Sequence, residues 1–290
     1  MKKNEKIDQN CNAKMPAKID AKISTLSIKP ILVPRELIYG KYCNDNRRVS
    51  VYCYLYCNRT YVDEVINYNI NYLLKWLKIR PDRNKGKTND IYADTLKRLY
   101  INGYFESDND DFNLSKKDIL LKMNPNRFRP SNFGIIYSNE LDMILNYKEY
   151  INDKSLIVRT SSSILLLLLS YIRSNLRINK YDTVDKLPEC CFRYYITIAN
   201  NLGITERMVS KHIKILNLLG IIEYKEVPRY QDSNGMWHTG LKVFANKYRY
   251  IKENNGYVID VFYSGKAEIK RQIKIITESI NSKKNSNIKK

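Results

Sequence analysis

Apolar residues between positions 196 and 224 recur at the spacing of two short helices that are separated by a tight turn. The inward positions are Ile198, Ala199, Leu202, Ile204, Val209, Ile213 and Leu216. Gly203 stands where the chain needs a left-handed turn residue, and Thr205 is a natural N-cap for the second helix. The pattern therefore predicts two helices that meet at a sharp angle.

The second of these helices keeps one face polar, starting at its N-terminus. That face carries Thr205, Glu206, Arg207, Ser210, Lys211 and Lys214. A helix that enters the major groove of DNA presents such a face to the bases, and an arginine on it can donate two hydrogen bonds to one guanine. We predict that these residues contact base edges.

A strand, a loop and a returning strand are predicted after this helix pair. Alternation and turn residues indicate strands over 220–227 and 236–244, with a turn at Asn234-Gly235 between them. The residues of this hairpin that we predict to contact the sugar-phosphate backbone are Lys225, Arg229 and Trp237. The alternative for Trp237 is that it packs the hairpin onto its own domain.

The N-terminal half shows a similar order of elements. The predicted order is a helix over 47–58, a strand over 61–67, helices over 69–79 and 90–102, and a strand that begins at Tyr104. The loop before the last helix is cationic, and we predict that it neutralises DNA phosphates through Arg80, Arg83, Lys85 and Lys87. Thr88 or Asn89 is expected to cap the helix that follows. The alternative is an accessory helical domain that packs on the C-terminal one.

Composition shifts along the chain predict six segments. They are a disordered basic arm over 1–27, an N-terminal domain over 28–123, a linker and bridging helix over 124–153, a C-terminal domain over 154–262, an amphipathic helix over 263–281 and a basic tail over 282–290. The bridging helix is expected to be capped by Ser138 or Asn139. An acidic loop over 107–111 is expected to face away from any duplex, because its carboxylates would repel phosphate.

The amphipathic helix carries a narrow stripe of isoleucines, which are Ile269, Ile273, Ile276 and Ile280. Such a stripe is too thin to form a core by itself. It can dock on the C-terminal domain, or it can pair with its copy in a homodimer. A basic amphipathic helix can also lie on a membrane, but this one lacks the aromatic residues that would anchor it there.

The charge of the chain favours a polyanionic partner. Its 50 Lys and Arg against 30 Asp and Glu give a formal net charge of +20, which attracts nucleic acid first and membrane surfaces second. No apolar run is long enough to span a bilayer and no secretion signal is visible, so we expect a cytoplasmic protein with reduced cysteines. The histidines are His212 and His238, and no nucleotide-binding loop or nucleophile elbow occurs. We therefore expect no metal, no cofactor and no enzymatic activity.

The helix pair and hairpin over 196–244 resemble the winged helix-turn-helix family, and the order of elements predicts a second such domain in the N-terminal half. The predicted fold is mainly α with small β-hairpins (α+β), with two winged helices and a C-terminal amphipathic helix. Tandem winged helices of this kind resemble the replication initiators of plasmids and phages from low-GC Gram-positive bacteria. The resemblance implies that the two domains bind neighbouring stretches of double-stranded origin DNA and that other segments recruit host replication proteins.

Two alternatives to initiation remain open from the sequence. A transcriptional regulator of a mobile element would use the same fold on the same kind of DNA, and no residue separates the two functions. The other alternative is a protein-protein adaptor, in which the winged helices contact a partner and the positive charge serves no DNA contact.

Overall fold

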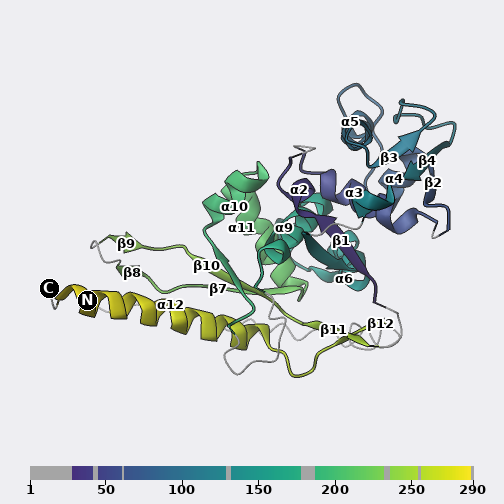
Figure 1. Cartoon of the computed structure of the whole chain (residues 1–290). Coiled ribbons are helices and arrows are strands. Elements are labelled where there is room, and N and C mark those ends of the chain that lie inside the picture. Colours follow the sequence, from purple (N-terminus) through teal and green to yellow (C-terminus); the bar gives the residue numbers. More distant parts are fainter. Residues whose placement is uncertain are drawn as a thin grey trace.

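The computed structural model describes residues 28–41, 45–60, 62–128, 132–177, 187–231, 236–253 and 256–288. Within them the chain forms helices and small antiparallel sheets, which confirms the predicted α+β class (Figure 1). The arm predicted over 1–27 and the turn predicted at Asn234-Gly235 lie outside the described residues. In the described part of the chain, no helix combines the length and the apolarity needed to cross a bilayer.

The N-terminal half holds a three-stranded sheet with helices packed on it. Its elements are β1 (Pro30–Pro34), α2 (Arg35–Ile38), α3 (Arg48–Asn58), β2 (Val65–Tyr68), α4 (Ile70–Trp76), α5 (Thr88–Ile101), β3 (Phe105–Ser107) and β4 (Ile119–Met123). Strand β4 was not predicted from the sequence. Its alternation is short but clear in the structure, because Ile119, Leu121 and Met123 are buried while Leu120 and Lys122 are exposed.

A central layer and a second three-stranded sheet make up the rest. The central elements are η1 (Pro125–Phe128), β5 (Phe133–Tyr137), α6 (Ser138–Leu145), α7 (Tyr147–Tyr150), α8 (Lys154–Ile157) and α9 (Ser162–Ser174). The C-terminal elements are β6 (Cys191–Arg193), α10 (Tyr195–Leu202), α11 (Glu206–Leu218), β7 (Ile222–Glu226), β8 (Tyr230–Gln231), β9 (Trp237–His238), β10 (Lys242–Asn246), β11 (Tyr250–Glu253), β12 (Gly256–Ile259) and α12 (Gly265–Ile288).

The two halves repeat one topology. The N-terminal module (48–123) runs α3, β2, α4, α5, β3, β4, and its sheet order is β2-β4-β3. The C-terminal module (162–246) runs α9, β6, α10, α11, β7, then β10 after the β8–β9 pair, and its sheet order is β6-β10-β7. In each module the strand between the first two helices therefore pairs with the last strand, and the last two strands form a hairpin.

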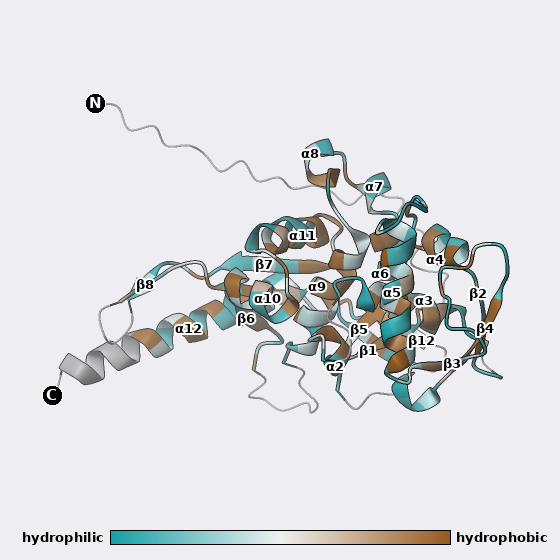
Figure 2. Ribbon diagram, turned by 90° about the horizontal axis from the view of Figure 1, so that it is seen from above, coloured by the Kyte–Doolittle hydropathy of each residue, from teal (hydrophilic) through white to brown (hydrophobic). Residues whose placement is uncertain are grey.

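One hydrophobic core spans both modules, and α9 lies at its centre. Figure 2 shows hydrophobic residues gathered around α9, which packs against α3, β5 and α11. Hydrogen bonds also join the two modules, because the Ser163 hydroxyl on α9 lies 2.8 Å from the Ser50 hydroxyl on α3 and 3.0 Å from the Tyr92 hydroxyl on α5. The modules therefore share one interior, and each depends on the other for burial of its first helix.

The described residues of 124–153, the segment predicted as a linker and bridging helix, belong to this core, and α6 forms where the bridging helix was predicted. Strand β5 pairs with β1 along its whole length, and Ile136, Leu141 and Ile144 are buried. A Cβ on Gly134 would lie 2.3 Å from the Ser170 carbonyl oxygen, so only glycine allows β5 to cross α9 this closely. The linker prediction was wrong because proline and asparagine punctuation marks the ends of short elements as well as open connections.

Two predicted helix caps were also wrong. The Ser138 hydroxyl accepts a hydrogen bond from the Lys29 N–H (3.0 Å), while the Glu140 carboxylate accepts one from the Tyr137 N–H that precedes α6. At α5 the N-cap is Lys87, and the Asn89 side chain accepts a hydrogen bond from the Asp82 N–H (2.9 Å). In both cases the side chain that was predicted to cap the helix instead accepts a hydrogen bond from a residue outside the helix.

Helix α12 docks on the outer face of the C-terminal sheet. Ile269 is buried, and Ile273 and Ile276 pack beside it against a cluster of Cys190, Val227, Leu241, Val243 and Ala245. The helix thus docks on the C-terminal module, which was one of the two alternatives. The docking covers the isoleucine stripe that pairing in a homodimer would use. The helix also continues to Ile288, past its predicted end at residue 281 and through most of the predicted tail; it runs alongside β7 and β8 (Figure 1).

A buried ion pair joins α9 to α6, and its arginine also reaches the C-terminal sheet. The Arg173 guanidinium on α9 donates two hydrogen bonds to the Glu140 carboxylate (2.5 and 2.6 Å), one to the Ile135 carbonyl and one to the Asn246 side chain. Both charged side chains are almost fully buried. Burial opposes the charge, but the neighbouring Glu140 carboxylate more than offsets this, so the pKa of Arg173 is raised above its ordinary value.

Glu140→Ala should destabilise the protein by about 3 to 5 kcal/mol, because it leaves the Arg173 guanidinium buried without its counterion. The free energy of unfolding in urea measures the loss. The matched control is Glu253→Ala, which removes an exposed carboxylate on β11 and should change the stability by no more than about 0.5 kcal/mol. Equal stability of the two variants would contradict this role for the pair.

Candidate nucleic-acid interface

The helix pair α10 and α11 forms as its sequence predicts. Gly203 ends α10 with a φ of 68°, a left-handed conformation that a side chain would strain. The Thr205 hydroxyl accepts a hydrogen bond from the Met208 N–H (3.3 Å), which caps α11. The predicted inward residues of α11, which are Val209, Ile213 and Leu216, are fully buried. The orientation of α11 about its axis is therefore fixed by the core.

The opposite face of α11 is open to solvent. Its exposed residues include Glu206, Arg207, Ser210 and Lys214. Arg207 makes no hydrogen bond or ion pair with the described part of the chain, so its guanidinium is available to a ligand. The exposed face matches the predicted one at these four positions.

Two of the predicted base contacts are already engaged. The Thr205 hydroxyl accepts the capping hydrogen bond, and the half-buried Lys211 ammonium donates a hydrogen bond to the Val158 carbonyl just after α8. This hydrogen bond places the end of α8 next to the face. At the start of α8, the hydrogen bond from the Ser155 hydroxyl lowers the pKa of Asp153, and the charge of Lys214 contributes to the shift. The available face is therefore narrower than the sequence predicts, and Arg207 and Ser210 lie at its centre.

His212 anchors α11 to α9. The side chain is only 1% exposed, and its Nε2 accepts a hydrogen bond from the Ser161 N–H (3.2 Å), while Nδ1 lies 2.7 Å from the Met208 carbonyl oxygen. Because Nε2 accepts, the ring proton is on Nδ1. Burial lowers the pKa of His212 to about 4, so the ring is neutral at pH 7 and supports the interface from inside.

The hairpin after α11 exposes Lys225 and Arg229 to solvent. The Arg229 guanidinium carbon lies 4.4 Å from the centre of the Trp237 ring. Trp237 is 57% exposed, so it does not pack the hairpin onto the module as the alternative proposed. Tyr230 does so, because it stacks on His238 and lies against the cluster beneath α12. An exposed arginine stacked on an exposed indole is free to contact a sugar-phosphate backbone.

The basic loop between α4 and α5 is also exposed. Its cations are Arg80, Arg83, Lys85 and Lys87, all of which are exposed. The loop is closed at its base, where the Asp90 carboxylate accepts a hydrogen bond from the Gly86 N–H (2.6 Å) and Asn89 contacts Asp82. These four side chains therefore extend from a braced loop, as a set of phosphate contacts requires.

The N-terminal equivalent of the α11 surface has mixed charge. The exposed face of α5 carries Asp94, Lys97 and Arg98, and Lys97 forms an ion pair with Asp110 (3.5 Å). The predicted acidic loop lies in the β3–β4 hairpin, which corresponds in topology to the hairpin after α11 in the C-terminal module. The two hairpins differ in charge, because 105–123 carries five acidic residues and three lysines, whereas 222–246 carries three residues of each sign.

Protein stability should fall as the pH decreases from about 6.5 towards 4, because the unfolded chain then binds a proton on His212 that the folded protein excludes. The full effect is on the order of 3 kcal/mol. Urea unfolding between pH 7 and pH 5 measures about 2 kcal/mol of this effect, which is the part that develops above pH 5. His212→Gln should flatten this pH dependence, whereas His238→Gln should retain it. If the free energy of unfolding depends on pH as steeply in His212→Gln as in the natural chain, the pH dependence does not come from His212.

Comparison of the chain with protein-family models, with curated proteins and with solved structures finds no match.

Proposed function

We propose that the protein is a sequence-specific double-stranded DNA-binding protein. The observation that carries the proposal is the exposed polar face of α11, with Arg207 and Ser210 at its centre, in the same module as a hairpin with Arg229 stacked on an exposed Trp237. A helix held rigidly from behind and polar in front can enter a major groove, while the hairpin contacts the adjacent backbone.

The repeated topology supports a tandem winged-helix protein. In each module a helix, a strand, two helices and a hairpin follow in the order of the winged helix-turn-helix family, and each sheet pairs its strands in the same order. Because the modules share one core, they present two surfaces at a fixed spacing. This fits neighbouring stretches of one duplex, and we propose a plasmid or phage replication initiator on that basis.

The charges suggest a division of roles between the modules. The C-terminal module distinguishes base sequences through α11, while the N-terminal module contributes affinity through the phosphate contacts of its basic loop. The mixed charge on α5 and its acidic hairpin favours a protein partner there, such as a host replication protein. Regulation of transcription on a mobile element is the second candidate. Iterated repeats in the preferred DNA would favour initiation, and a single palindrome would favour regulation.

Arg207→Ala should reduce the preference for the selected site. We expect a loss of about 1 to 3 kcal/mol on a duplex selected from a random pool, which is about 5- to 150-fold, with little change on unrelated duplex. Gel-shift titrations of both duplexes measure the ratio. Lys252→Ala, an exposed change on β11, is the control and should leave it unchanged. An equal loss on both duplexes would assign Arg207 to the backbone instead.

Arg83→Ala should weaken binding to every duplex by a similar factor. If Arg83 neutralises one phosphate, the slope of log affinity against log salt should become shallower by about 0.9. Titrations at several salt concentrations give this slope for the natural chain and the variant. Binding of the natural chain that does not weaken as salt rises would refute the DNA-binding proposal as a whole.

A further inference from the structure

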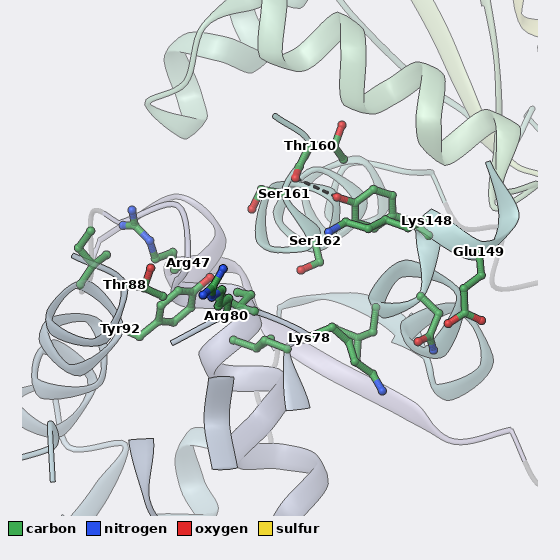
Figure 3. A pocket seen from close by; sticks show the side chains of 16 residues that line it. Arg47, Lys78, Arg80, Thr88, Tyr92, Lys148, Glu149, Thr160, Ser161 and Ser162 are labelled. Carbon is green, nitrogen blue, oxygen red and sulfur yellow. Dashed lines mark hydrogen bonds between the residues drawn. The ribbon is translucent and has the colours of Figure 1, made fainter. Parts of the chain in front are cut away.

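A cavity of about 500 Å³ opens where the two modules meet (Figure 3). Its wall is formed by the end of α4 and the loop after it, the first turn of α5, the segment around α7, and the N-terminus of α9. The function proposed above assigns a phosphate contact to Arg80 but to no other residue of this lining. Its volume lies in the range of sites for small molecules and is ample for a phosphate group with part of what it is attached to.

The charged residues that line the cavity are mostly cationic. They are Arg47, Lys78, Arg80 and Lys148, with Glu149 as the acidic exception. Arg47 is neutralised by Asp45 (2.8 Å). Lys78, Arg80 and Lys148, by contrast, form no ion pair within the described ranges. With the Glu149 carboxylate counted against these three cations, the lining keeps a net positive charge. Positive charges gathered around one hollow attract an anion more strongly than the same charges spread over an open surface.

The side chains are arranged to meet a ligand from several directions. In Figure 3, Arg80 and Lys148 extend towards the same space from different walls, and Ser162 lies between them. The Tyr147 hydroxyl donates a hydrogen bond to the Thr160 carbonyl (3.0 Å), which holds the wall that carries Lys148. Ser162 is the first residue of α9, where helix N–H groups lack intrahelical acceptors and the helix dipole adds positive potential.

We propose that this cavity binds a phosphate group, with the Arg80 guanidinium and the Lys148 ammonium as its charged contacts and the Ser162 hydroxyl as a hydrogen-bond donor. Mixed guanidinium, ammonium and hydroxyl donors match the oxygens of a phosphate, which accepts hydrogen bonds on all sides. The phosphate can belong to a DNA backbone or to a free nucleotide.

The position of the cavity favours the DNA backbone. One wall leads to the basic loop and α5, and the opposite wall includes Ser161, whose N–H is bonded to His212 of α11. The cavity therefore lies between the two surfaces to which DNA contacts are assigned above. A duplex that bridges them brings its backbone past this point. This source of the phosphate rests on the proposed function, whereas a free nucleotide does not.

Calorimetric titration of the full chain with ATP and with pyrophosphate, without metal and at low salt, tests the free-nucleotide source. Binding at one site that weakens at least about tenfold in Lys148→Gln and in Arg80→Gln supports the proposal. The matched control is Lys117→Gln, an exposed lysine on the β3–β4 hairpin that should leave this binding unchanged. Circular dichroism confirms that each variant is folded.

Duplex titrations over a range of salt concentrations test the backbone source. Lys148→Gln should make the salt slope shallower by about 0.9 and leave the preference for the selected site unchanged, while Lys117→Gln changes neither. If the natural chain binds no duplex, the proposed function is refuted. The calorimetric titrations then decide by themselves whether the cavity binds a phosphate group. If Lys148→Gln alters neither nucleotide binding nor the duplex slope, the phosphate site is refuted even where DNA binding stands.

Discussion

A buried guanidinium requires a counterion and a full set of acceptors, and Arg173 finds them on three different elements. Its contacts place α6, β5 and β10 around α9 in one arrangement. Because α9 is the helix on which α11 rests, this constraint also fixes the helix that we assign to the major groove. The position of the exposed face of α11 is thus set in the interior, away from the residues to which we assign DNA contacts.

The sequence predicted the elements whose signals are local. Gly203 and Thr205 mark the turn and the cap of α11 within a few residues, and helical spacing alone places Arg207 on the exposed face. Strand β4 was missed because it pairs with β2 and β3, and its own alternation covers only five residues. The predicted caps at α5 and α6 were wrong for a similar reason, since the side chains of Asn89 and Ser138 accept hydrogen bonds from residues outside their helices.

The sequence alone could not predict the features of the interface that depend on tertiary contacts. Lys211 shares a helical face with Arg207, but only the position of α8 shows that a carbonyl engages its ammonium. Burial of Trp237 was a reasonable expectation for an indole. The structure instead packs the half-buried Tyr230, one position along the opposite strand, against the cluster beneath α12. The cavity joins Arg80, Lys148 and Ser162 from three separate segments, so no spacing in the chain could indicate it.

The acidic β3–β4 hairpin limits how a duplex could lie on this protein. Its carboxylates repel phosphate, so under the proposed function the N-terminal module does not place its hairpin on a DNA backbone. Its cations are instead on the α4–α5 loop, which ends at the cavity beside α9. Under the proposed function, a duplex would therefore approach this module from the side of the junction. The repeated topology thus carries an asymmetric surface, with the proposed base contacts at one end and the proposed phosphate contacts directed towards the middle.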